Sequence, residues 1–129
     1  MTKVKEIMTR KLLKIEANQT VREAVTLMTE YGVGSLVVEK DQEVIGIFEE
    51  SDIVKKVLAK DLNPYVTKVE KVMSVPFVID QEKSDDEASD LMIRQNVRRL
   101  VVSDGAAIVG ILSMQDLLRP VYAGKSFWT

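Results

Sequence analysis

The chain has 129 residues, 46% hydrophobic and 29% charged, with a formal net charge of −2. This length suits about one domain with an apolar core, and the balanced charge gives no reason to expect nucleic acid or an anionic membrane as a partner. Cysteine and histidine are absent, which excludes disulfides, thiolate or histidine-dependent catalysis and the usual zinc sites. The N-terminus lacks the apolar core of a signal peptide, and no apolar run approaches the roughly 20 residues of a membrane helix. We therefore expect a cytoplasmic protein.

The first half of the chain predicts a regular succession of short elements. Residues 3–8 predict a turn of amphipathic helix and residues 12–15 a short strand. Thr20-x-x-Glu23 is a capping box, and apolar residues follow it at helical spacing as far as Tyr31. Residues 35–39 and 43–48 predict two strands. A second helix opens near Ser51 and carries four apolar residues on its expected inner side: Ile53, Val54, Val57 and Leu58.

The second half repeats this pattern. At an offset of 64, residues 20–57 align without a gap on residues 84–121, and twelve of the 38 aligned positions are identical. A second capping box stands at Ser84-x-x-Glu87, and two apolar runs around Ser103-Asp104-Gly105 predict a hairpin. We predict repeats at 1–60 and 69–124, a linker at 61–68 and a tail at 125–129. Because a lone core of about 60 residues is marginal, we expect the halves to pack their strand faces together about a pseudo-two-fold axis.

This order of elements, which occurs twice in the chain, resembles the cystathionine β-synthase (CBS) domain pair. Each copy ends in Gly-hydrophobic-hydrophobic-(Ser/Thr)-x-x-Asp, seen most fully from Gly110 to Asp116, and the openings Met8-Thr9 and Met73-Ser74 also match. The resemblance implies an α/β (α+β) fold of tandem repeats, each a small sheet with two helices. It further implies two clefts at the junction of the repeats that bind adenosine compounds (AMP, ADP, ATP or S-adenosylmethionine), and association as homodimers through helices.

Three residues of the second copy are the leading site candidates. The resemblance implies that Asp116 holds ribose hydroxyls, which its two carboxylate oxygens suit, and that Ser113 lies near ribose and phosphate, where a helix N-terminus favours an anion. Ser113 with Asp116 would equally cap a helix without any ligand. The resemblance also implies that Arg98 contacts phosphate, a role that suits a guanidinium. The other interpretation of Arg98 is a solvated strand edge.

The first copy departs from this pattern. Glu49 stands where Ser or Thr is expected, and together with Glu50 it would repel a phosphate. Glu is a poor N-cap, so the cap would move toward Ser51. Asp52 could still hold a ribose. We therefore predict that the second copy is the better nucleotide site.

Adenine would need an apolar slot with backbone hydrogen bonds. The candidates are Val75, Phe77, Val78 and Ile111, each of which would serve equally as ordinary core. In the tail, Phe127 and Trp128 would dock on a neighbouring subunit or partner.

The resemblance implies a stand-alone regulatory module, and the absence of histidine and cysteine argues against an enzyme. We expect it to bind an adenosine nucleotide, AMP first, and to signal to an unidentified regulated protein. We expect no catalytic residues, no metal, no other cofactor, and neither nucleic acid nor membrane as a partner. The alternative is a structural or protein-interaction module of the same fold without a ligand.

Overall fold

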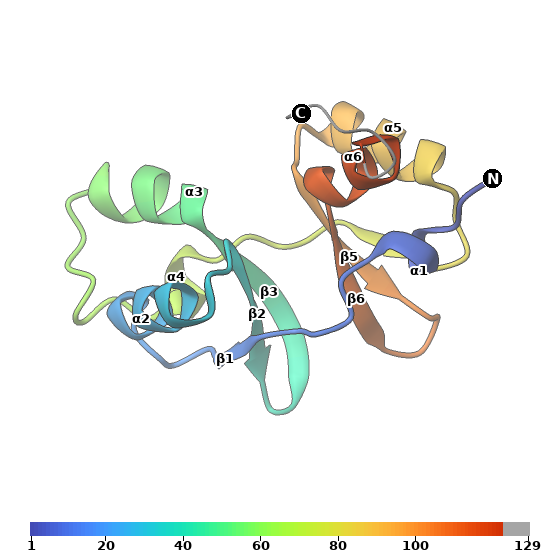
Figure 1. Ribbon diagram of the computed structural model, residues 1–129. Helices are drawn as coiled ribbons and strands as arrows, with labels where there is room; N and C mark the ends of the chain where they lie inside the picture. The colour runs from blue at the N-terminus through green and yellow to red at the C-terminus, as the bar shows by residue number, and fades with distance from the viewer. Residues whose placement is uncertain (123–129) are drawn as a thin grey trace. The chain divides into compact units, whose positions relative to one another are not determined.

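The computed structural model describes residues 1–122, which form two compact α+β units with one three-stranded sheet each (Figure 1). Residues 13–76 make one unit, here called the central unit. Residues 1–12 and 77–122 make the other, here called the terminal unit. Within the described residues, no helix is long and apolar enough to cross a membrane.

The central unit is built on a sheet of order β1-β2-β3. Its strands are β1 (Lys14–Glu16), β2 (Ser35–Lys40) and β3 (Glu43–Glu49), with β1 parallel and β3 antiparallel to β2. The helices of this unit are α2 (Val21–Tyr31), α3 (Glu50–Asp52), η1 (Ile53–Leu58) and α4 (Val69–Val72). The element types match the predicted order, with the first strand beginning two residues later than predicted.

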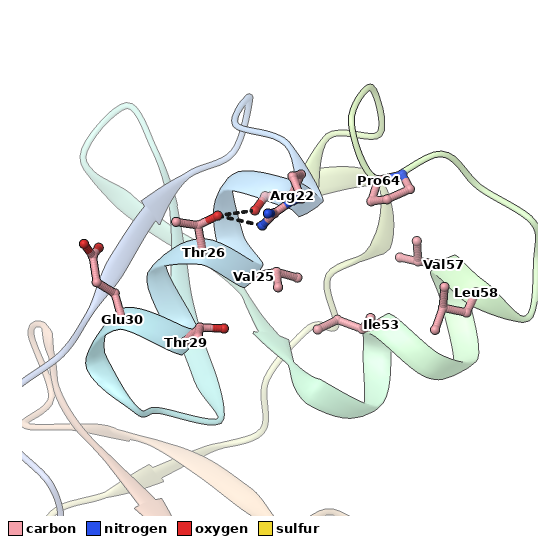
Figure 2. Close-up of a pocket in the computed structure, with 9 residues that line it drawn as sticks. All are labelled: Arg22, Val25, Thr26, Thr29, Glu30, Ile53, Val57, Leu58 and Pro64. Carbon is pink, nitrogen blue, oxygen red and sulfur yellow. Dashed lines mark hydrogen bonds between the residues drawn. The ribbon is translucent and has the colours of Figure 1, made fainter.

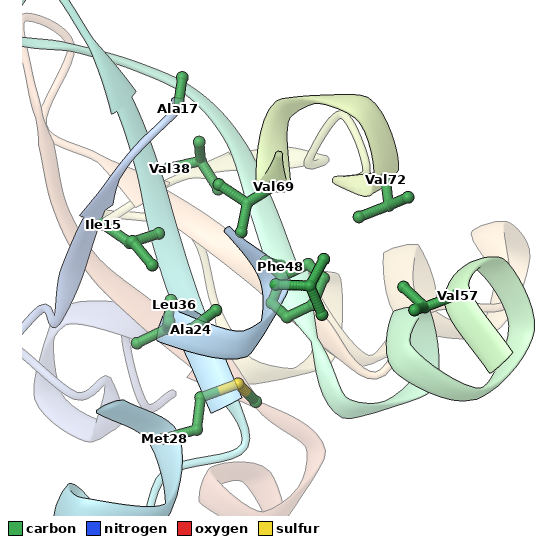
Figure 3. Close-up of a cluster of buried hydrophobic side chains, with 11 residues drawn as sticks. Ile15, Ala17, Ala24, Met28, Leu36, Val38, Phe48, Val57, Val69 and Val72 are labelled. Carbon is green, nitrogen blue, oxygen red and sulfur yellow. The ribbon is translucent and has the colours of Figure 1, made fainter. Parts of the chain in front are cut away.

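The core of the central unit lies between one sheet face and these helices (Figure 3). Leu36 and Val38 alternate along β2 and reach this face together with Phe48 of β3, because successive strand residues point to opposite sides. Ala24 and Met28 of α2 pack against them at helical spacing.

The predicted inner side of the second helix is only partly right. Val57 is buried, but Val54 is 60% and Leu58 62% exposed. Residues 53–58 wind as a π-helix, with the amide of Ala59 donating to the Val54 carbonyl at 3.0 Å. Ile53 and Val57 face the core, so the inner side of this helix carries only two of the four predicted residues.

The terminal unit has the same plan. Its sheet has the order β4-β5-β6, formed by β4 (Val78–Asp80), β5 (Arg99–Ser103) and β6 (Ile108–Ser113). Its helices are α1 (Val4–Ile7), α5 (Asp85–Gln95) and α6 (Met114–Tyr122). A turn at residues 104–107 joins β5 to β6, as the hairpin pattern predicts, and Leu100, Val102 and Leu112 face the core.

The opening segment of each sequence repeat packs on the later elements of the other repeat. Thr9 exchanges two backbone hydrogen bonds with Ile111 of β6 (2.9 and 3.0 Å), and Ser74 does the same with Ile47 of β3 (2.9 Å each). A Cβ on Gly110 would lie 2.8 Å from the Thr9 carbonyl oxygen. The motif glycine is thus required by the close approach of this segment. The compact units therefore cut across the repeats at 1–60 and 69–124.

Candidate functional site

Asp116 and Ser113 form a reciprocal cap at the start of α6. The Ser113 amide donates to Asp116 Oδ2 at 2.8 Å, and the Asp116 amide donates to Ser113 Oγ at 3.1 Å. Asp116 is only 4% exposed. The predicted pairing of these two side chains is confirmed as local geometry, and it places a carboxylate and a hydroxyl at a helix N-terminus, where amides favour negative charge.

Arg98 lies at the same end of the β5–β6 hairpin. Its carbonyl accepts the Met114 amide at 2.9 Å, and the next residue, Arg99, pairs with Ser113 in the strand register. Arg98 is exposed. The structure therefore brings the backbone of Arg98 beside the first turn of α6 and so beside Asp116.

The apolar candidates are only partly gathered around this end of the sheet. Val78 pairs with Val101, which pairs with Ile111, so the three share the sheet face opposite the core. Phe77 precedes β4, and its carbonyl accepts the Val101 amide at 2.9 Å. Val75 belongs to the central unit instead.

Asp52, the counterpart of Asp116, is held by a network of its own. Its Oδ2 accepts the Glu49 amide at 2.8 Å, so Glu49 and not Ser51 is the N-cap residue, which corrects the expectation for this helix. Its Oδ1 accepts the Ser74 hydroxyl at 3.2 Å and lies 3.1 Å from Lys56 Nζ. Asp52 is as buried as Asp116, at 4% exposed.

The sequence did not single out Lys56 or Ser74 as site residues. Lys56 Nζ donates to Ser74 Oγ at 2.8 Å and to the Met73 carbonyl at 3.3 Å, so it joins Asp52 to the opening segment of the second repeat. The available signal was the i,i+4 spacing of Asp52 and Lys56. The contact with residues 73–74 required the fold.

A groove of about 600 Å³ lies elsewhere on the central unit, between α2 and η1 (Figure 2). Val25, Ile53, Val57 and Leu58 supply its apolar lining. It contains none of the predicted ligand residues. At its rim, Arg22 donates to Thr26 Oγ1 at 2.8 Å, as the dashed lines in Figure 2 show.

No cluster of three or more acidic residues that could hold a metal ion occurs between residues 1 and 122. The predicted docking residues Phe127 and Trp128 lie outside the residues that the structure describes.

Comparisons with known proteins agree on the family. The CBS domain model matches residues 4–59 and again residues 69–122. An uncharacterized protein of Methanopyrus kandleri is 36% identical over 90% of the chain, which spans 61% of that protein's length. A CBS domain-containing protein of Bacillus subtilis, YhcV, is 33% identical, with 91% of this chain and 84% of that protein covered.

Solved structures support the same assignment. A protein with CBS domains from Burkholderia ambifaria aligns with a TM-score of 0.89 at 32% identity, covering 98% of both chains. The CBS domain pair of protein MJ0100, solved in complex with 5′-methylthioadenosine and S-adenosyl-L-methionine, aligns with a TM-score of 0.84 at 22% identity, covering 97% of this chain and 99% of its own. The chain belongs to the CBS domain family, with two CBS repeats of mixed α+β structure.

Proposed function

We propose that the protein is a regulatory CBS-domain module that binds an adenosine nucleotide, AMP first, through Asp116, with Ser113 and Arg98 as phosphate contacts. The observation that carries this proposal is the convergence of these three residues at the first turn of α6, in one compact unit. The MJ0100 pair, whose structure contains two adenosine compounds, supports the ligand class.

The chemistry at this end of α6 suits a phosphorylated ribose. A carboxylate offers about four lone-pair positions, and the Ser113 amide donates to Asp116 Oδ2 at 2.8 Å. The two hydroxyls of a ribose cis-diol are donors of the kind that a carboxylate accepts. Arg98 supplies a guanidinium, the side chain best shaped for bidentate binding of phosphate. Binding would then signal to a partner protein through its differential affinity for two states of the module.

Asp116→Asn separates ribose recognition from helix capping. The amide oxygen can still accept the Ser113 N–H, whereas the NH2 group cannot accept a ribose hydroxyl. Isothermal titration should show AMP binding to the wild type and at least a tenfold weaker affinity in this variant, since a hydrogen bond to a charged group contributes about 1.5–3 kcal/mol. Asp52→Asn is the matched control and should leave this affinity unchanged. Equal AMP affinity in wild type and Asp116→Asn would overturn the proposal.

Arg98→Gln tests the phosphate contact separately. Adenosine lacks the phosphate, so the variant should lose affinity for AMP while its affinity for adenosine stays the same. An equal loss for both ligands would show that Arg98 acts on the fold rather than on phosphate.

We also propose that the module forms a homodimer through the groove between α2 and η1. An exposed Leu58 beside an apolar groove is the kind of surface that a second subunit covers. Leu58→Asp would place a charge in that contact and should shift the dimer to monomer in light scattering. If the wild-type protein is monomeric at high protein concentration as well as after 100-fold dilution, this assembly is wrong.

The second candidate is a protein-interaction module that binds no ligand. The same groove favours it, because an apolar surface that contains none of the predicted ligand residues can serve association alone. Absence of heat and of thermal shift with any adenosine compound at millimolar concentration would favour this candidate over the first.

A further inference from the structure

We propose that the charges on α2 select the α2 helix of a second copy of this chain as their partner, in antiparallel register, with Arg22 facing Glu30 of the partner subunit. This inference rests on the homodimer of the proposed function and deepens it, because it specifies the register of the contact and the residues that determine it. Both residues belong to the central unit.

One face of α2 lines the groove. Arg22, Thr26 and Glu30 recur on it every four residues, with Val25 and Thr29 between them. Thr26 is the midpoint of this series, so Arg22 and Glu30 each lie about 6 Å from it along the helix axis. A two-fold axis through Thr26, perpendicular to α2, therefore places Arg22 of each copy opposite Glu30 of the other. The face is complementary to itself.

The charges of Arg22 and Glu30 are not compensated within the described chain. Both side chains are exposed, and no ion pair between residues 1 and 122 involves either of them. The Arg22 guanidinium donates to Thr26 Oγ1 at 2.8 Å and lies 5.9 Å from the centre of the Tyr65 ring. These contacts are with uncharged groups, and a guanidinium has five N–H donors. Arg22 can therefore also bind a carboxylate of a second copy.

Thr26 suits the centre of such a contact. Its hydroxyl accepts a hydrogen bond from Arg22 at 2.8 Å and donates to the Arg22 carbonyl at 3.1 Å. Because the hydroxyl already acts as donor and acceptor within the chain, a second helix can cover it without leaving a buried polar group unpaired. Its small side chain also allows the two helices to approach closely.

The equivalent helix of the second repeat does not match this face. At the repeat offset of 64, Asp86 of α5 corresponds to Arg22 and Arg94 corresponds to Glu30, so the charges recur in reverse order. An antiparallel pairing of α2 with α5 of a second copy would place Arg22 opposite Arg94 and Glu30 opposite Asp86. Such like-charge contacts suppress a wrong partner. A pairing of α5 with itself would bring the two copies of Asp90 together. The charges therefore favour α2 with α2.

Charge reversal tests this register. Arg22→Glu and Glu30→Arg should each weaken dimerisation at least tenfold in a light-scattering dilution series, because each variant places like charges opposite each other twice in the dimer. Lys60→Glu is the matched control. It reverses an exposed charge that does not line the groove, and it should leave the dimer affinity unchanged.

Mixing the two variants is the more specific test. In a mixed dimer, the carboxylate introduced by Arg22→Glu faces the guanidinium introduced by Glu30→Arg, and the two unaltered residues face each other. An equimolar mixture should therefore dimerise at concentrations where each variant alone is monomeric. The double variant Arg22→Glu/Glu30→Arg should dimerise by itself for the same reason.

The outcomes separate this inference from the proposed homodimer. If the mixture stays monomeric while melting temperatures show folded proteins, the register is wrong. Tighter dimerisation of Arg22→Glu would also refute it, because that is the result expected if α2 faces Arg94 of α5. If Arg22→Glu does not fold, an unchanged dimer affinity in Glu30→Arg refutes the inference. Dissociation by Leu58→Asp without any effect of these charge reversals would leave the homodimer standing and the register refuted.

Discussion

Replacing Gly110 with alanine should detach the opening segment of the chain from β6. The new Cβ would lie 2.8 Å from the Thr9 carbonyl oxygen, whereas ordinary contact begins at 3.4 Å, so Thr9 would have to move by about 0.6 Å. That shift would stretch the two hydrogen bonds between Thr9 and Ile111, now 2.9 and 3.0 Å, to about 3.5 Å. At about 0.5–1.5 kcal/mol for each bond, the free energy of unfolding should fall by about 1–3 kcal/mol.

Amide hydrogen exchange at Thr9 and Ile111 tests this directly, because both amides donate in the affected pair. Gly105→Ala is the matched control. Gly105 has a φ of 99° and nothing within 4 Å of its would-be Cβ, so alanine there costs about 1–2 kcal/mol of backbone strain without pushing Thr9. Protection of Thr9 should fall further in Gly110→Ala than in the control. Equal protection in the two variants would refute the reasoning.

Two further predictions concern stability. Hydrogen bonds from Lys3 and then Lys5 lower the pKa of Glu82 to about 2. Since this folded-state pKa lies below the unfolded value of 4.5, the stabilisation is present above pH 4.5 and is lost as the pH falls through 2. Wild type should therefore exceed Glu82→Gln in urea stability at pH 7, and this difference should shrink steadily as the pH falls from 4.5 toward 2; a constant difference would contradict the pairing. Phe48→Ala should lower the unfolding free energy by about 3–5 kcal/mol, and a loss below 1 kcal/mol in urea unfolding would show that Phe48 is not a core residue.

Features that depend on near neighbours in the chain could be predicted from the sequence. The capping boxes at Thr20 and Ser84 start α2 and α5, with the Glu23 and Glu87 amides each donating to the cap hydroxyl at 3.1 Å. Gly32 ends α2 in the left-handed conformation. These signals act within one or two turns of helix, so the residue types and their spacing are enough to predict where the helices begin and end.

Features that depend on contacts between distant segments could not be predicted from the sequence. The repeat shows that Met8-Thr9 and Met73-Ser74 are equivalent, but spacing does not say which strand each segment joins. Lys56 stands four residues after Asp52, which is ordinary spacing for a charge on a helix surface. It becomes part of a network only because the fold brings Ser74 within hydrogen-bonding distance. The π-helical winding of residues 53–58 also escaped prediction, because the apolar pattern there fits an α-helix equally well.

A double-mutant cycle between protein and ligand tests the central claim, that Asp116 holds the ribose. AMP and 2′-deoxy-AMP would be titrated into wild type and Asp116→Asn. Loss of the 2′-hydroxyl should weaken binding to the wild type at least tenfold and have little effect in Asp116→Asn, giving a coupling energy of about 1.5–3 kcal/mol. If the 2′-hydroxyl contributes equally to affinity in both proteins, the coupling is zero and Asp116 does not contact the ribose.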